Sequence, residues 1–137
     1  MEQARLNELT ATLLRVSLGA MYLAHGLVLK ILTFGLAGTA GFFVSIGLPA
    51  WLGYATAIGE AVGGVLLLLG VQTRLVALAL SPTLLGAIIW VHARNGWVFS
   101  APGGGWEYPA FLLVVSLAVA ALGSGAYALQ RTSRATG

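Results

Sequence analysis

The sequence predicts an all-α integral membrane protein, an antiparallel four-helix bundle with a short interfacial helix between its first and second spans. Of the 137 residues, 58% are hydrophobic and 8% are charged, whereas soluble domains carry about 25% charged residues. Four apolar segments also reach the roughly 20 residues that a helix needs to cross the hydrocarbon layer. Because irregular backbone is excluded from lipid, we expect these segments to pack as one domain over residues 1–137.

The first predicted span covers residues 9–32. A cleavable signal peptide is the alternative, but this segment lacks a basic start and is longer than the roughly 7–15 apolar residues of a signal-peptide core. The other three spans are predicted at residues 51–70, 75–93 and 109–129. Gly123 and Gly125 lie near the end of the last span, where the helix is expected to fray.

The two connections on the outer side have different compositions. Residues 33–50 are apolar but contain four glycines, which predicts a short interfacial helix at about residues 36–46, ended by Gly47 and Pro49. Residues 94–108 contain an Asn-Gly turn, three successive glycines and four aromatic residues, which suit the headgroup region. We expect the three glycines at residues 103–105 to form a flexible lid, with Trp106 and Glu107 at the mouth of the bundle.

The distribution of basic residues predicts the orientation in the membrane. An even number of spans places both termini on one side, and the basic residues on that side outnumber those opposite. The positive-inside rule therefore predicts a multi-pass cell membrane protein with both termini in the cytoplasm. The terminal side would hold Arg5, Arg74, Arg131 and Arg134, and the opposite side Lys30 and Arg94.

The same composition excludes several kinds of function. The basic residues are scattered, so no stripe for nucleic acid is present. The chain contains no cysteine, which excludes disulfides, thiolate metal sites and a thiol nucleophile. Any redox chemistry therefore needs electrons carried by a bound cofactor or substrate.

A short internal similarity points to a duplicated helical hairpin. Leu18-Gly19-Ala20 and Leu85-Gly86-Ala87 each precede a histidine at the same offset, namely His25 and His92. Counting about 1.5 Å per residue along each helix places both histidines near the outer boundary of the membrane.

Apart from Lys30, which is assigned to the outer side, four charged or histidine residues lie within the predicted spans: Arg15, His25, Glu60 and His92. Each costs about 2.5–3.5 kcal/mol on insertion scales, and such residues normally face the bundle interior. On the first helix, Tyr22 shares one face with Arg15 and His25. We expect Glu60 to be paired with Arg15 or His25; in the alternative, Arg15 extends to the cytoplasmic headgroups and Glu60 only fastens helices together.

The two histidines also raise the question of a metal or haem site. A bis-imidazole haem would use His25 and His92, and a metal site would add Glu60 and Glu107. Two histidines near one boundary of the membrane supply one pair of axial ligands for a haem iron and few other ligands. We therefore expect no metal.

These residues together resemble the DoxX family of small four-helix membrane proteins, over about residues 9–127. One departure is Trp106, where the family usually has tyrosine. The matching segments are Leu14-Arg15, Ala24-His25-Gly26 and Lys30; Gly38-Thr39-Ala40-Gly41-Phe42-Phe43 with Gly47-Leu48-Pro49; Glu60 within residues 59–64; Leu69-Gly70 with Thr73-Arg74; His92 with Asn95-Gly96; and residues 103–108.

The resemblance implies a subunit of a membrane-associated oxidoreductase system, such as a thiosulfate to quinone oxidoreductase. Because no cysteine or evident site for a sulfur anion is present, quinone contact is the property that carries over best. A quinol needs an acceptor for its phenolic protons, for which we expect His25, oriented by Glu60, to be the catalytic pair. The expected ligand-binding residues are Arg15, Tyr22, His92, Trp106, Glu107 and Tyr108.

Two further functions remain open. One is a non-catalytic scaffold or chaperone for partner proteins, and the other is a small transporter, for which a dimer would be needed to form a path. In each case the expected partners are the lipid bilayer and either other proteins or further copies of this chain.

Overall fold

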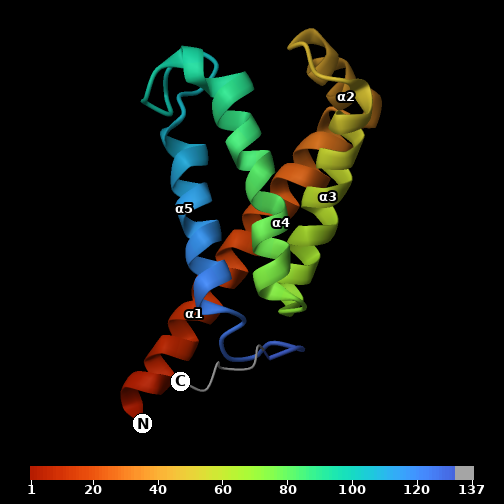
Figure 1. Ribbon diagram of the computed structural model, residues 1–137. Coiled ribbons are helices and arrows are strands. Elements are labelled where there is room, and N and C mark those ends of the chain that lie inside the picture. Colours follow the sequence, from red (N-terminus) through yellow and green to blue (C-terminus); the bar gives the residue numbers. More distant parts are fainter. Residues whose placement is uncertain (132–137) are drawn as a thin grey trace.

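The computed structural model describes residues 1–131, which are organised as helices joined by short connections (Figure 1). The longest element is α1 (Glu2–Leu23), which continues into a π-helical segment, η1 (Ala24–Thr33). After it come α2 (Leu36–Ser45), α3 (Ala50–Leu69), α4 (Thr73–Gly86), the π-helical η2 (Ala87–His92), the 3-10 turn η3 (Ala93–Asn95) and α5 (Glu107–Leu122).

Three helical stretches are long and apolar enough to cross a membrane: Glu2–Thr33, Ala50–Leu69 and Thr73–Asn95. The fourth predicted span, α5, has 16 residues and is therefore about 24 Å long. The predicted all-helical membrane fold is confirmed, as is the short helix between the first two long ones. That helix, α2, ends one residue before the predicted boundary.

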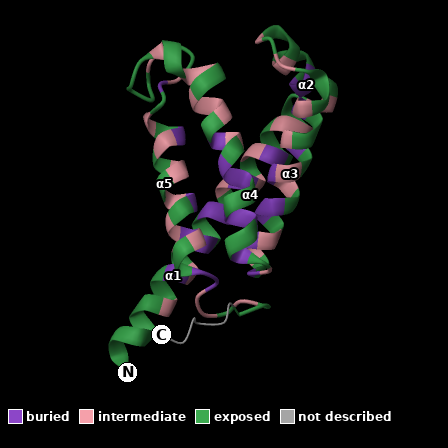
Figure 2. Cartoon of the chain, in the orientation of Figure 1, coloured by how far each residue is buried: buried purple, intermediate pink, exposed green. Residues whose placement is uncertain are grey.

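The first helix begins at Glu2, well before the predicted residue 9. Its first turns extend beyond the other helices and are exposed (Figures 1 and 2). Counting apolar residues locates the part of a helix that lies in hydrocarbon, so it misses polar turns that continue into the headgroup region.

The fourth helix ends at Leu122, whereas residue 129 was predicted. Gly123 and Gly125 have φ values of +87° and +67°, in the left-handed region that glycine adopts without strain and that ends an α-helix. The following residues, 123–131, form a carboxyl-terminal strap that crosses α1 near Glu8 and the carboxyl-terminal end of α3. The backbone N–H groups of Leu129 and Gln130 donate to the carbonyls of Leu69 and Gly70.

The core lies toward the terminal end of the bundle, where α1, α3, α4 and α5 meet (Figure 2). Leu18, Leu67, Ala77 and Val119 are fully buried there. Toward the opposite end, α4 and α5 diverge from α2 and α3 (Figure 1). The bundle is therefore closed at its terminal end and widest at the other, which we call the outer end.

Close contact between the first and third helices depends on glycine. A Cβ added at Gly26 would collide with the backbone nitrogen of Ala61, and one at Gly64 would lie 2.5 Å from the backbone nitrogen of Leu23. By contrast, a Cβ at Gly59, on the same α3, would meet nothing within 4 Å. The small residues thus let two helix backbones approach each other directly.

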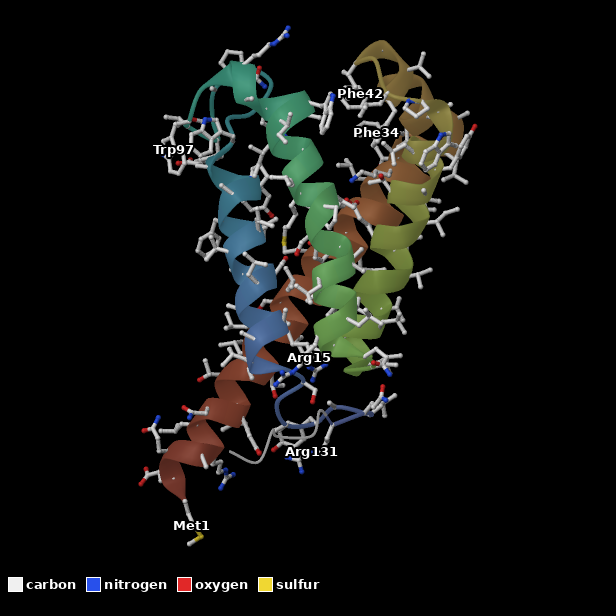
Figure 3. The ribbon with its side chains drawn as sticks, in the orientation of Figure 1. Met1, Arg15, Phe34, Phe42, Trp97 and Arg131 are labelled. Carbon is white, nitrogen blue, oxygen red and sulfur yellow. The ribbon has the colours of Figure 1, made fainter. Side chains whose placement is uncertain are left out.

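Both described chain ends lie at the closed end. Met1 and Arg131 are at the same end of the bundle, opposite the aromatic residues Phe34, Phe42 and Trp97 (Figure 3). This arrangement agrees with an even number of membrane crossings. Arg134, which the sequence placed on the same side, lies outside the described residues.

The glycine contact yields a matched pair of variants. Gly26→Ala is expected to lower the free energy of unfolding by about 1–3 kcal/mol, because the new methyl group has no room beside Ala61. Gly59→Ala makes the same change in open space and should leave stability unchanged or raise it slightly, because alanine favours helix. Thermal unfolding in detergent, followed by circular dichroism, measures both. Equal stability of the two variants would contradict the packing described here.

Candidate functional site

The structure brings together two of the predicted site residues, His25 of η1 and Tyr108 in the first turn of α5. Their ring centroids lie 6.2 Å apart, with the ring planes 32° from parallel. The Tyr108 hydroxyl donates a hydrogen bond of 3.4 Å to the sulfur atom of Met21. We call His25, Tyr108 and Met21 the outer cluster. It joins the first helix to the last.

The hydrogen bond of His25 determines its tautomer. Its Nδ1 lies 2.8 Å from the backbone oxygen of Met21, and a carbonyl oxygen can only accept. Nδ1 therefore carries a proton, and Nε2 of the neutral ring is an acceptor. His25 is half-buried, so part of its side chain remains exposed.

Glu60 is paired within the bundle, as expected, but its partner is Lys30. The Lys30 Nζ lies 2.5 Å from Glu60 Oε2. The exposed fraction of the side chain is 19% for Lys30 and 7% for Glu60. Pairing opposite charges avoids the cost of an isolated charge at membrane depth. The prediction that Glu60 pairs with Arg15 or His25 is wrong.

The partner of Glu60 could have been found from helical spacing. Gly26 packs directly against Glu60 and Ala61. Lys30 follows Gly26 by four residues, so it lies about one turn farther along the same face, within reach of Glu60. Counting depth alone placed Lys30 at the outer boundary and overlooked the length of its side chain.

Arg15 lies at the closed end, away from the outer cluster (Figure 3). It is 1% exposed, so it does not extend to the headgroups. Its Nε donates to the carbonyl of Ser124 at 2.8 Å, and one terminal nitrogen donates to the carbonyls of Leu67 and Leu68 at 2.6 and 2.8 Å. The other terminal nitrogen lies 3.3 Å from the carbonyl of Ala126. Arg15 thus joins the end of α3 to the strap and does not act on Glu60.

Tyr22 serves the core. Its hydroxyl lies 3.1 Å from the Ser116 hydroxyl, and Ser116 donates its own proton to the carbonyl of Leu112. Tyr22 therefore donates to Ser116, which links α1 to α5. With 4% exposure, Tyr22 is not open to a ligand in this conformation.

The three remaining predicted residues hold the outer loop in shape. His92 donates through Nδ1 to the carbonyl of Gly104, and Glu107 accepts the backbone N–H of Phe99 at 2.8 Å. Trp106 packs edge-on against Trp97, with ring centroids 4.5 Å apart. These contacts connect the loop to η2 and α5.

The two histidines of the internal similarity occupy similar local structures. His25 is the second residue of η1, and His92 is the last residue of η2. π-Helical segments are rare, and single π-helical turns often occur at functional sites, although η1 with its 10 residues is longer than one turn. The histidines nevertheless differ in their partners, since His25 contacts Tyr108 and His92 bonds the loop. Within residues 1–131, no three His, Asp or Glu side chains are grouped so that they could hold a metal ion.

The Lys30–Glu60 ion pair predicts a specific pattern of stability. Glu60→Gln and Lys30→Met should each lower the free energy of unfolding by about 1–3 kcal/mol, because each leaves a charge, half-buried on Lys30 or buried on Glu60, without its partner. The double variant should be less destabilised than the two single variants added together. Unfolding in detergent measures all three proteins. Strict additivity would show that the two charges do not stabilise each other.

Comparison with known proteins agrees with this structure. The family profile described as DoxX matches residues 10–93. A protein of Bacillus subtilis (strain 168) named "Putative oxidoreductase CatD" is 39% identical over 122 residues, which cover 89% of this chain and 85% of the relative. No solved structure matches the chain. The chain is therefore a multi-pass membrane protein that belongs to the DoxX family.

Proposed function

We propose that this protein is a quinone- or quinol-binding subunit of a membrane oxidoreductase system, and that the outer cluster binds the quinone ring. The observation that carries the proposal is the contact between His25 and Tyr108, a proton acceptor and a hydroxyl donor side by side in a membrane protein. The name of the Bacillus subtilis relative, an oxidoreductase, supports the same class of function.

The chemistry of the two side chains suits the two oxygens of a quinol. His25 Nε2 accepts a phenolic proton, while the Tyr108 hydroxyl donates to the other ring oxygen. Tyr108 currently donates to Met21 sulfur, which is a weak acceptor, so a ligand oxygen would replace that bond at little cost. Oxidation of the bound quinol would release two electrons to a redox centre in a partner protein, since this chain contains no cysteine to hold an iron–sulfur or thiolate centre. Of the two protons released, one would pass to His25 and the other to the external solvent.

Glu60 is proposed to act on His25 through its charge and not by direct proton transfer, because its partner is Lys30. Gly26, the neighbour of His25, packs against Glu60. Lys30 balances the carboxylate when it is ionised. His92, Trp106 and Glu107 are proposed as positioning residues, since they fix the loop from which the chain enters α5 at Tyr108.

We also propose that the closed end faces the cytoplasm. Arg5, Arg74 and Arg131 belong to this end, whereas Arg94 belongs to the opposite one. The positive-inside rule supports this orientation, which would open the outer cluster toward the external leaflet.

Titration with a menaquinone or ubiquinone analogue in nanodiscs tests the proposal. Wild-type protein should bind saturably, and His25→Phe should weaken binding about tenfold or more, because it keeps a ring but removes the acceptor. Tyr108→Phe should weaken binding less. Arg94→Ala, an exposed change at the same end, is the control and should bind as wild type does.

Two results would overturn the proposal. One is the absence of saturable binding to wild-type protein, alone or with its partners. The other is equal binding by His25→Phe and wild type. Either result would favour a non-catalytic scaffold for partner proteins.

A further inference from the structure

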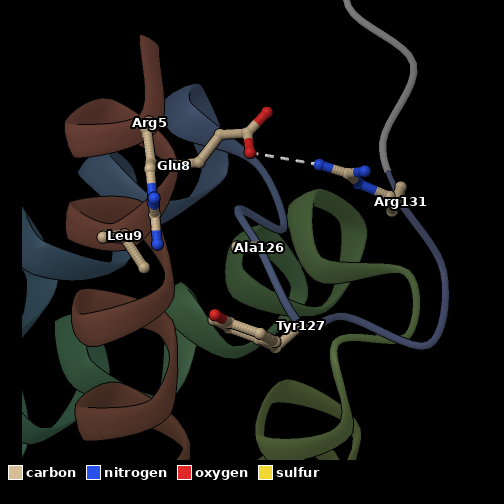
Figure 4. Close-up of a pocket in the computed structure, with 6 residues that line it drawn as sticks. All are labelled: Arg5, Glu8, Leu9, Ala126, Tyr127 and Arg131. Carbon is tan, nitrogen blue, oxygen red and sulfur yellow. Dashed lines mark hydrogen bonds and ion pairs between the residues drawn. The ribbon is translucent and has the colours of Figure 1, made fainter. Parts of the chain in front are cut away.

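A hollow lies at the closed end of the bundle, opposite the end that holds the outer cluster. It has a volume of about 420 Å³ and is open to the surface. Figure 4 shows it between the first turns of α1 and the strap. We call it the terminal bowl. Its lining residues are Arg5, Glu8, Leu9, Ala126, Tyr127 and Arg131.

The wall that the strap contributes is fixed by hydrogen bonds. The backbone N–H of Ala126 donates to the carbonyl of Glu8, and the Thr12 hydroxyl donates to the carbonyl of Ala126 at 2.8 Å. Farther along, the Gln130 side chain accepts the backbone N–H of Gln72. The bowl is therefore preformed, which lowers the entropic cost of binding a ligand.

Positive charge dominates this hollow. Arg131 is anchored by an ion pair of 3.2 Å with Glu8, which leaves other guanidinium N–H groups available. Within residues 1–131, the side chain of Arg5 has no hydrogen bond or ion pair. Figure 4 draws both arginines and the side chain of Tyr127, which extends toward α1.

A third guanidinium lies behind the wall. Arg15 contacts the carbonyl of Ala126 from the buried side, and in the described part of the chain its partners are carbonyl oxygens rather than carboxylates. Carbonyl dipoles solvate its charge without cancelling it. Arg5, Arg131 and the buried Arg15 carry three positive charges, and Glu8 carries one negative charge. The formal net charge in and behind the bowl is therefore +2.

We propose that the terminal bowl binds a phosphate ester, presented by an anionic phospholipid headgroup or by a soluble molecule. Guanidinium groups recognise phosphate oxygens through paired, charge-assisted hydrogen bonds. The bowl offers two such groups, a tyrosine hydroxyl and the apolar side chain of Leu9. One of its lining residues, Arg131, lies beyond the core at the same end of the bundle as Met1 (Figure 3). We place this end at the level of the lipid headgroups, because it extends past the apolar spans. This site is independent of the quinone proposal.

Lipid titration of the full chain in detergent tests the site. Short-chain phosphatidylglycerol should bind saturably, and the double variant Arg5→Gln/Arg131→Gln should bind about tenfold more weakly or worse. Both side chains are exposed, so these changes should leave the fold intact. The control is Arg74→Gln, an exposed arginine that is outside the bowl and should not alter binding. Phosphatidylcholine, which has no net charge, should bind weakly.

Competition by glycerol phosphate distinguishes the two sources of the phosphate group. Displacement of the lipid would assign the bowl to a soluble phosphate ester, and failure to displace it would assign the bowl to a lipid headgroup. Equal weakening by Arg74→Gln would show attraction to general surface charge and would overturn the proposal. Unchanged binding by the double variant would overturn it as well.

Discussion

The closed end of the bundle depends on one buried guanidinium. The last carbonyls of a helix have no partner within it, and where they are buried another group must supply the donors. Arg15 supplies donors to Leu67 and Leu68 at the end of α3 and to Ser124 and Ala126 in the strap. Its positive charge also suits the negative end of the α3 dipole. One side chain thereby joins three segments that are far apart in the sequence.

The two ends of the molecule therefore differ in structure and in proposed role. Around Arg15 the core is tightly packed and the strap is tied down, so this end provides a rigid base and the wall of the terminal bowl. At the outer end the helices diverge, and polar side chains pair across helices: His25 with Tyr108, and Lys30 with Glu60. Close contact at Gly26 connects the two pairs, because it sets Glu60 against the helix that carries His25.

Much of the fold follows from the sequence, because apolar length and glycine punctuation are local signals. They located α2 almost to the residue and three long helices with it. Side-chain partners follow less well, since counting along a helix gives depth but not direction around the axis. Hence Lys30 was missed as the partner of Glu60, and Arg15 was assigned to a site that it does not reach. The contact of His25 with Tyr108 needed the tertiary arrangement of the first and last helices.

The division between a structural closed end and a ligand-binding outer end can be tested with one variant. Arg15→Lys keeps the charge but removes the planar fork that reaches several carbonyls. Hydrogen exchange in nanodiscs should then show faster exchange at the strap amides of Ala126, Leu129 and Gln130, while amides near His25 stay protected and affinity for a quinone analogue stays unchanged. Unaltered exchange in the strap, or loss of quinone affinity in this variant, would contradict the account.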